Sequence, residues 1–121
     1  MKEKKSEKTT DISFQNTNNK SEESYEFYKV LSSINDPEEM RLLLEDLCTY
    51  KELEYLVQRL NSAIMLLKGA TYQQVGETVD NISTATLSRV SRCIKHGSGG
   101  YSDVLKKYIE MENETNAKNN S

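Results

Sequence analysis

The stretch ISTATLSRVSRCIKHG (residues 82–97) decides the fold and raises the question of function. It gathers short hydroxyl side chains, an alanine and several cations in a chain whose net charge is -3. Ser83 is a suitable N-cap for a helix over residues 84–96. The glycines of GSGG (residues 97–100) are predicted to end that helix, because glycine accepts the left-handed conformation common at helix ends.

A shorter helix with its own start signal precedes this one. Thr71 and Gln74 have the spacing of a capping box, which predicts a helix from there to Val79. Asp80 and Asn81 follow as a turn, and asparagine is the best non-glycine residue for a positive φ. A short helix, a tight turn and a second helix form a helix-turn-helix outline.

The two helices are predicted to share one core. Its apolar members are Val75, Val79, Ile82, Leu87 and Val90. Gly76 is small enough to let the two helices approach each other. The outer side of the second helix is then left to hydroxyl, alanine and basic residues.

This outer side has the chemistry of a recognition helix. Short hydroxyls near a helix N-terminus can bond to phosphates or base edges, an alanine can meet a thymine methyl, and cations reach phosphates. The residues predicted to contact double-stranded DNA are Thr71, Tyr72, Gln73, Ser83, Thr84, Ala85, Thr86, Ser88, Arg89, Arg92 and Lys95.

The charge distribution supports the same interpretation. Residues 82–107 hold five Lys and Arg residues against Asp103 alone and have a net charge of +4, which leaves -7 for the remainder. A protein with an acidic body and one basic end has an electrostatic field that orients the basic end towards a polyanion.

The rest of the chain also predicts helices. Asp36 and Pro37 have the order of an N-cap and first helical residue, for a helix over residues 37–47. Thr49 can cap the next helix, whose apolar residues repeat every three or four positions until Gly69 ends it. A short first helix over residues 25–34 and a last helix, capped by Ser102, complete an all-α fold of about six helices.

Composition sets the domain boundaries. Residues 1–20 are predicted to be a mobile polar arm and residues 113–121 a mobile tail, because neither buries enough apolar surface to offset its ordering entropy. Residues 21–112 would form the helical DNA-binding domain, a marginal core for one chain. The longest apolar run has five residues, and no secretory signal opens the chain, so no membrane is expected and a cytoplasmic location is predicted.

Other functions are less well supported by the residues. Cys48, Cys93 and His96 lack the spacing of a metal site or disulfide framework, and no orienting acid or phosphate loop accompanies the histidine, so catalysis and a metal cofactor are not expected. A helical protein-interaction adaptor with no specific DNA site remains the alternative, because a basic helix face is often only solvated.

Three motifs carry a resemblance to a known family. DLCTYKELEYLVQRL (residues 46–60), LLKGATYQQV (residues 66–75) and STATLSRVSRCIKHGSGGY (residues 83–101) resemble the Trp repressor superfamily, in its YerC/YecD, Trp-repressor-like branch. The resemblance covers residues 37–108. It implies an intertwined homodimer that places two recognition helices in successive major grooves and represses transcription.

The resemblance also implies a corepressor pocket. Two arginines sandwich the tryptophan ring in the repressor that gives the superfamily its name, and the motifs align them with Arg59 and Arg89. The glycine that leaves room for the ring is Val90 here, and a serine that helps hold the amino group is Cys93. The candidate pocket comprises Thr49, Arg59, Arg89, Val90 and Cys93; any small-molecule corepressor would be something other than tryptophan.

Overall fold

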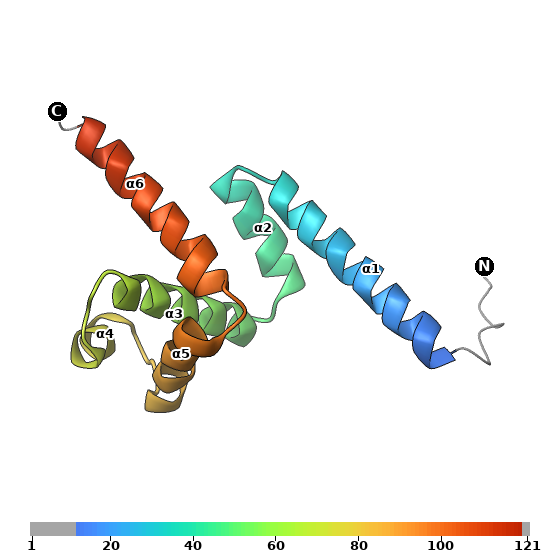
Figure 1. The fold of residues 1–121 in the computed structure, drawn as a ribbon, viewed down its shortest axis with the longest axis horizontal. Coiled ribbons are helices and arrows are strands. Elements are labelled where there is room, and N and C mark those ends of the chain that lie inside the picture. The colour runs from blue at the N-terminus through green and yellow to red at the C-terminus, as the bar shows by residue number, and fades with distance from the viewer. Residues whose placement is uncertain (1–11, 120–121) are drawn as a thin grey trace. The chain divides into compact units, whose positions relative to one another are not determined.

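The computed structural model describes residues 12–119, which contain six α-helices and one π-helical turn (Figure 1). In chain order these are α1 (Ile12–Ser33), α2 (Pro37–Leu47), α3 (Tyr50–Leu67), α4 (Tyr72–Thr78), α5 (Thr84–His96), η1 (Gly100–Leu105) and α6 (Lys106–Asn119). The predicted all-α fold is confirmed. The chain divides into two compact units, Met1–Leu47 and Cys48–Ser121.

The first unit contains α1 and α2. The start of α2 is as predicted, because the Asp36 carboxylate accepts a hydrogen bond of 3.0 Å from the Glu39 backbone N–H. The start of α1 differs from the prediction: it begins at Ile12, inside the segment assigned to a mobile arm. No glycine or proline interrupts the chain between Ile12 and Tyr25, so nothing breaks the helix there. The rest of the predicted arm, residues 1–11, lies outside the described residues.

The side chains of the first unit are largely exposed to solvent in the part that the structure describes. None of residues 21–47, whose exposure the structure describes, is buried. Large apolar side chains remain open to solvent, such as Tyr25 at 65% and Leu47 at 53% exposure. These two helices therefore have no enclosed core in the single chain.

The second unit is built on α3. Thr49 caps this helix with a full capping box, since its hydroxyl accepts from the Glu52 N–H at 3.1 Å and the Glu52 carboxylate accepts from the Thr49 N–H at 2.8 Å. Figure 1 shows α4 near the end of α3 and α5 packed across its middle. The capping box of Thr71 and Gln74 at the start of α4 is likewise present, as predicted.

The helix-turn-helix core matches most of its prediction. Val75, Val79 and Leu87 form one buried cluster, and Ile82 is partly buried against it. Val90 is also buried, with 1% of its surface exposed. The role predicted for Gly76 is wrong: it is exposed, and a Cβ added there would meet no atom within 4 Å. The two helices approach each other through their valine and leucine side chains instead.

The end of α5 and the start of α6 also differ in detail. Helix α5 ends at His96 with Gly97 as its C-cap, as predicted, but the left-handed residue is Gly99, with φ 100°. The Gly99 carbonyl then accepts from the Asp103 and Val104 N–H groups at 2.9 and 3.1 Å, which begins η1. Ser102 lies inside this turn, so its prediction as an N-cap is wrong. Helix α6 continues to Asn119, beyond the predicted start of a mobile tail at residue 113.

Candidate nucleic-acid interface

The start of α5 is fixed by its cap and by the turn before it. The Ser83 hydroxyl accepts a 3.0 Å hydrogen bond from the Thr86 N–H, as an N-cap does, and lies 2.9 Å from the Thr86 hydroxyl. Asn81 has a φ of 62° and is the only described non-glycine residue with a positive φ. The predicted turn and cap are therefore confirmed.

One side of α5 is open to solvent. At 3.6 residues per turn, its exposed predicted contact residues fall on a single face. They are Thr84, Ala85, Ser88, Arg89, Arg92 and Lys95. We call this set the α5 outer face.

Thr86 lies beside this face rather than on it. It is half-buried and lines a cavity of about 320 Å³ together with Lys51, Tyr55 and Arg59 of α3. Its hydroxyl is also engaged with Ser83. Thr86 is therefore less available to a groove than the prediction assumed.

The cations of the α5 outer face form no ion pair with a described residue. Helix α5 contains no Asp or Glu, and within residues 12–119 no carboxylate forms an ion pair with Arg89, Arg92 or Lys95. By contrast, Arg41 in α2 is paired with two glutamates. The positive potential of α5 is therefore unneutralised within the described chain.

The predicted contacts at the start of α4 are exposed as well. Tyr72 is 49% exposed, and the Thr71 hydroxyl caps the helix by accepting from the Gln74 N–H. The Gln73 side-chain amide donates a 3.1 Å hydrogen bond to the Glu77 carboxylate. The second amide N–H and the amide oxygen of Gln73 remain available to a nucleic acid.

The structure brings four of the five predicted pocket residues together. Arg59 from α3 and Arg89, Val90 and Cys93 from α5 line one cavity of about 360 Å³. Thr49 is not among its lining residues: it is the N-cap of α3, ten residues before Arg59.

Sequence reasoning missed three residues that complete this cavity: Leu56, Leu60 and Tyr101. The spacing of Leu56 and Leu60 around Arg59, within one turn of α3, could have indicated them. Tyr101 follows the glycines after α5 and carried no comparable signal.

Arg59 has an unusual environment in this cavity. Its guanidinium carbon lies 5.9 Å from the centre of the Tyr55 ring, within the range of a cation–π interaction. Its Nε atom is buried and has no hydrogen-bond partner in the described chain. The guanidinium is thus only partly satisfied and retains donors for an acceptor in the cavity.

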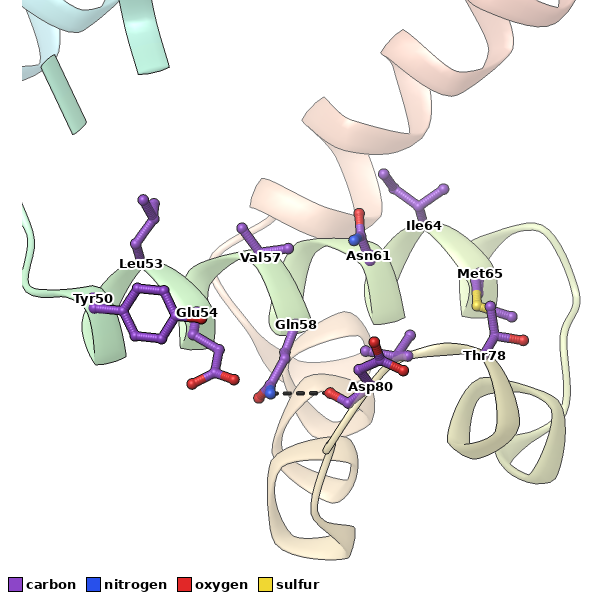
Figure 2. A pocket seen from close by; sticks show the side chains of 11 residues that line it. Tyr50, Leu53, Glu54, Val57, Gln58, Asn61, Ile64, Met65, Thr78 and Asp80 are labelled. Carbon is purple, nitrogen blue, oxygen red and sulfur yellow. Dashed lines mark hydrogen bonds between the residues drawn. The ribbon is translucent and has the colours of Figure 1, made fainter. Parts of the chain in front are cut away.

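A larger cavity of about 580 Å³ lies between α3 and the helix-turn-helix, and its lining is shown in Figure 2. The buried Gln58 side chain donates from Nε2 to the Asp80 carbonyl oxygen across 3.1 Å. Sequence reasoning missed Gln58, because a lone polar residue in an amphipathic helix carries no periodic signal.

Two kinds of feature are absent from the described residues. No described helix is long and apolar enough to cross a membrane. Within the same residues no three His, Cys, Asp or Glu side chains are grouped as a metal site.

The capped α4, the turn with left-handed Asn81 and the α5 outer face define a protein of the helix-turn-helix class. The chain belongs to the Trp repressor protein family, whose model matches residues 22–109. It is 40% identical to an uncharacterized protein, YerC, of Bacillus subtilis (strain 168), over 93 residues that cover 77% of this chain and 88% of YerC.

A solved structure shares the fold. The crystal structure of a candidate Trp repressor from Staphylococcus aureus superposes with a TM-score of 0.63 at 33% identity, over 69% of this chain and 83% of that one. The resemblance stated from the three motifs is therefore confirmed.

Proposed function

We propose that the chain is a sequence-specific DNA-binding transcriptional repressor that inserts α5 into the major groove. The observation that carries this proposal is the α5 outer face, where hydroxyls and three unpaired cations lie on a helix held by a buried core. The cations supply sequence-independent phosphate contacts, and Thr84, Ala85 and Ser88 are small enough to approach base edges. Membership of the Trp repressor family supports the same function.

The functional unit is a homodimer in this proposal. Helix α3 exposes large apolar side chains, including Leu56 at 45%, Val57 at 50% and Leu60 at 47%. Such a contiguous apolar surface is unusual for a monomer and suits a second copy of the chain. Two α5 helices related by a two-fold axis would read half-sites about one helical turn apart.

The cavity framed by Arg59 and Arg89 is the site of any corepressor in this proposal. Its volume of about 360 Å³ is at the small end of ligand pockets. Two guanidinium groups favour a carboxylate or phosphate, to which arginine binds in a bidentate manner. A small anion is therefore a better candidate than tryptophan.

Selection of bound duplexes from a random pool tests the function directly. We expect a pseudo-palindromic site to be enriched and to stay bound in the presence of competitor DNA, at an affinity at least about a thousandfold above non-specific binding. A selected site placed within a promoter should then lower reporter expression. Weak retention that salt abolishes, with no enriched sequence, would favour the protein-interaction adaptor instead.

A further inference from the structure

We infer that Gln58 positions the recognition helix by holding the peptide that joins Asp80 to Asn81. This inference rests on the proposed function. Gln58 is 6% exposed, and its Nε2 donates to the Asp80 carbonyl oxygen at 3.1 Å from 22 residues away in sequence. Figure 2 shows the bond at the edge of the 580 Å³ cavity, reaching from α3 to the turn.

The peptide that accepts this bond controls the path of the chain. Its orientation is set by ψ of Asp80 and φ of Asn81, and Asn81 has the left-handed φ of 62°. Asparagine tolerates that conformation better than other non-glycine residues but less well than glycine, so rotation of the peptide would relieve a small strain. A hydrogen bond to the Asp80 oxygen opposes the rotation, because the oxygen would move away from its donor.

The other contacts of the turn constrain this peptide only weakly. Val79 and Ile82 anchor the turn on either side through apolar packing, which has no preferred direction. The Ile82 N–H lies 3.5 Å from the Val79 oxygen, at the limit of a hydrogen bond. Among the described residues, Gln58 is the one side chain that bonds to the backbone of the turn from another helix.

The consequence for DNA binding follows from where α5 starts. Ser83 caps the helix and Thr84 is its first residue, so only two residues separate the held peptide from the cap. A different peptide orientation would change the direction in which the chain enters α5. Gln58 is therefore a positioning residue: it touches no DNA, but it fixes the angle of the α5 outer face.

A Gln58→Met variant is the test, because methionine has a similar size and shape and lacks the donor. Asn61→Met is the matched control: Asn61 lies on the next turn of α3, lines the same cavity, and makes no hydrogen bond in the described chain. Two quantities are measured for each variant: amide hydrogen exchange, and affinity for a duplex selected by the wild type against a shuffled duplex of equal composition.

We expect Gln58→Met to exchange faster at residues 81–84 and to leave the rest of the second unit unchanged. Its affinity for the selected duplex should fall about two- to tenfold, the range of one net hydrogen bond, with no change for the shuffled duplex. Asn61→Met should match the wild type in both measurements. Two results would overturn the inference. One is that residues 81–84 of Gln58→Met exchange at the wild-type rate. The other is that Gln58→Met exchanges faster throughout the second unit and binds both duplexes equally more weakly.

If Gln58→Met does not fold, Gln58→Leu gives the same test. Leucine also lacks the donor, and it carries no charge that burial would penalise. Failure of the proposed function can be told apart from failure of this inference. If the wild type binds no duplex preferentially, the proposed function is wrong. The exchange rate at residues 81–84 then decides by itself whether Gln58 holds the turn.

Discussion

At the scale of single residues, we expect Val90 to limit which ligand the arginine-lined cavity can accept. It is 1% exposed and lines the cavity between Arg59 and Arg89, where a flat aromatic ring would have to lie. We predict that tryptophan at millimolar concentration neither binds nor changes DNA affinity. Titration calorimetry measures this directly, and a saturable heat that disappears in Arg89→Ala would contradict it.

A Val90→Gly variant provides the matching gain-of-binding test. It removes the side chain and leaves both arginines in place, so it should acquire measurable affinity for tryptophan. If it does not, the cavity is limited by something other than Val90, and Cys93 is the next candidate, because a thiol is a weak hydrogen-bond partner.

Glu38 and Arg41 give a second prediction at this scale. The Arg41 guanidinium bonds to both Glu38 oxygens and lies 2.8 Å from a Glu45 oxygen. The bond to Arg41 lowers the pKa of Glu38, and the bonds to Glu38 and Glu45 raise the pKa of Arg41. A carboxylate with a lowered pKa favours the folded state above its unfolded pKa, and this contribution is lost as pH falls through the folded value.

We therefore expect the Glu38 pKa, followed by carbon NMR of its carboxyl, to rise towards its ordinary value in Arg41→Ala. The shift should shrink in high salt, because the pair is solvent-exposed. The same Glu38 titration in both proteins would show that the pair does not form in solution.

At the scale of the elements, we expect the residues of α5 to divide into those that contact phosphates and those that contact bases. Arg92→Ala and Lys95→Ala should weaken binding to all sequences alike and reduce the salt slope by roughly 0.9 for each phosphate that the protein no longer neutralises. Ser88→Ala lies on the same face and should relax preference at one base position, by about 1–3 kcal/mol if it makes a good base contact. Binding to a panel of single-base variants distinguishes these effects, and identical behaviour of all three would contradict the docking of this face in the groove.

The elements themselves were largely predictable, because their signals are local. Thr49, Thr71 and Ser83 each lie within four residues of the backbone groups that they cap, so spacing alone identified the helix starts. Gly76 and Ser102 were misassigned for the opposite reason. Whether a glycine allows close approach, or a serine meets a helix start, depends on neighbours that spacing does not specify.

At the scale of the whole molecule, the missed features are those that join distant segments. Gln58 bonds across 22 residues to Asp80, and Arg59 shares its cavity with α5. The arginine pair was found only through resemblance to a family, and nothing comparable indicated Gln58. Burial of a polar side chain is decided by packing, which a periodic pattern describes only on average.

The open apolar surfaces make dimerisation the central prediction for the whole molecule. Sedimentation at micromolar concentration should give twice the chain mass of 13.9 kDa. Leu60 is 47% exposed in the single chain, so a carboxylate there can stay hydrated in the monomer but would be costly inside an apolar interface. Leu60→Asp should therefore dissociate the dimer and leave the second unit helical.

Ala63→Asp is the contrasting variant on the same helix, three residues further along. Ala63 is fully buried within the single chain, so a carboxylate there has no access to water and should unfold the second unit itself. Circular dichroism and sedimentation together distinguish the two effects. Leu60→Asp should keep its helicity and sediment with half the mass of the wild type. Ala63→Asp should lose its helicity. A wild-type monomer would contradict the homodimer itself. A Leu60→Asp protein that stays dimeric would mean that this face of α3 is not the interface, and the exposed residues of α1 and α2 would be tested next.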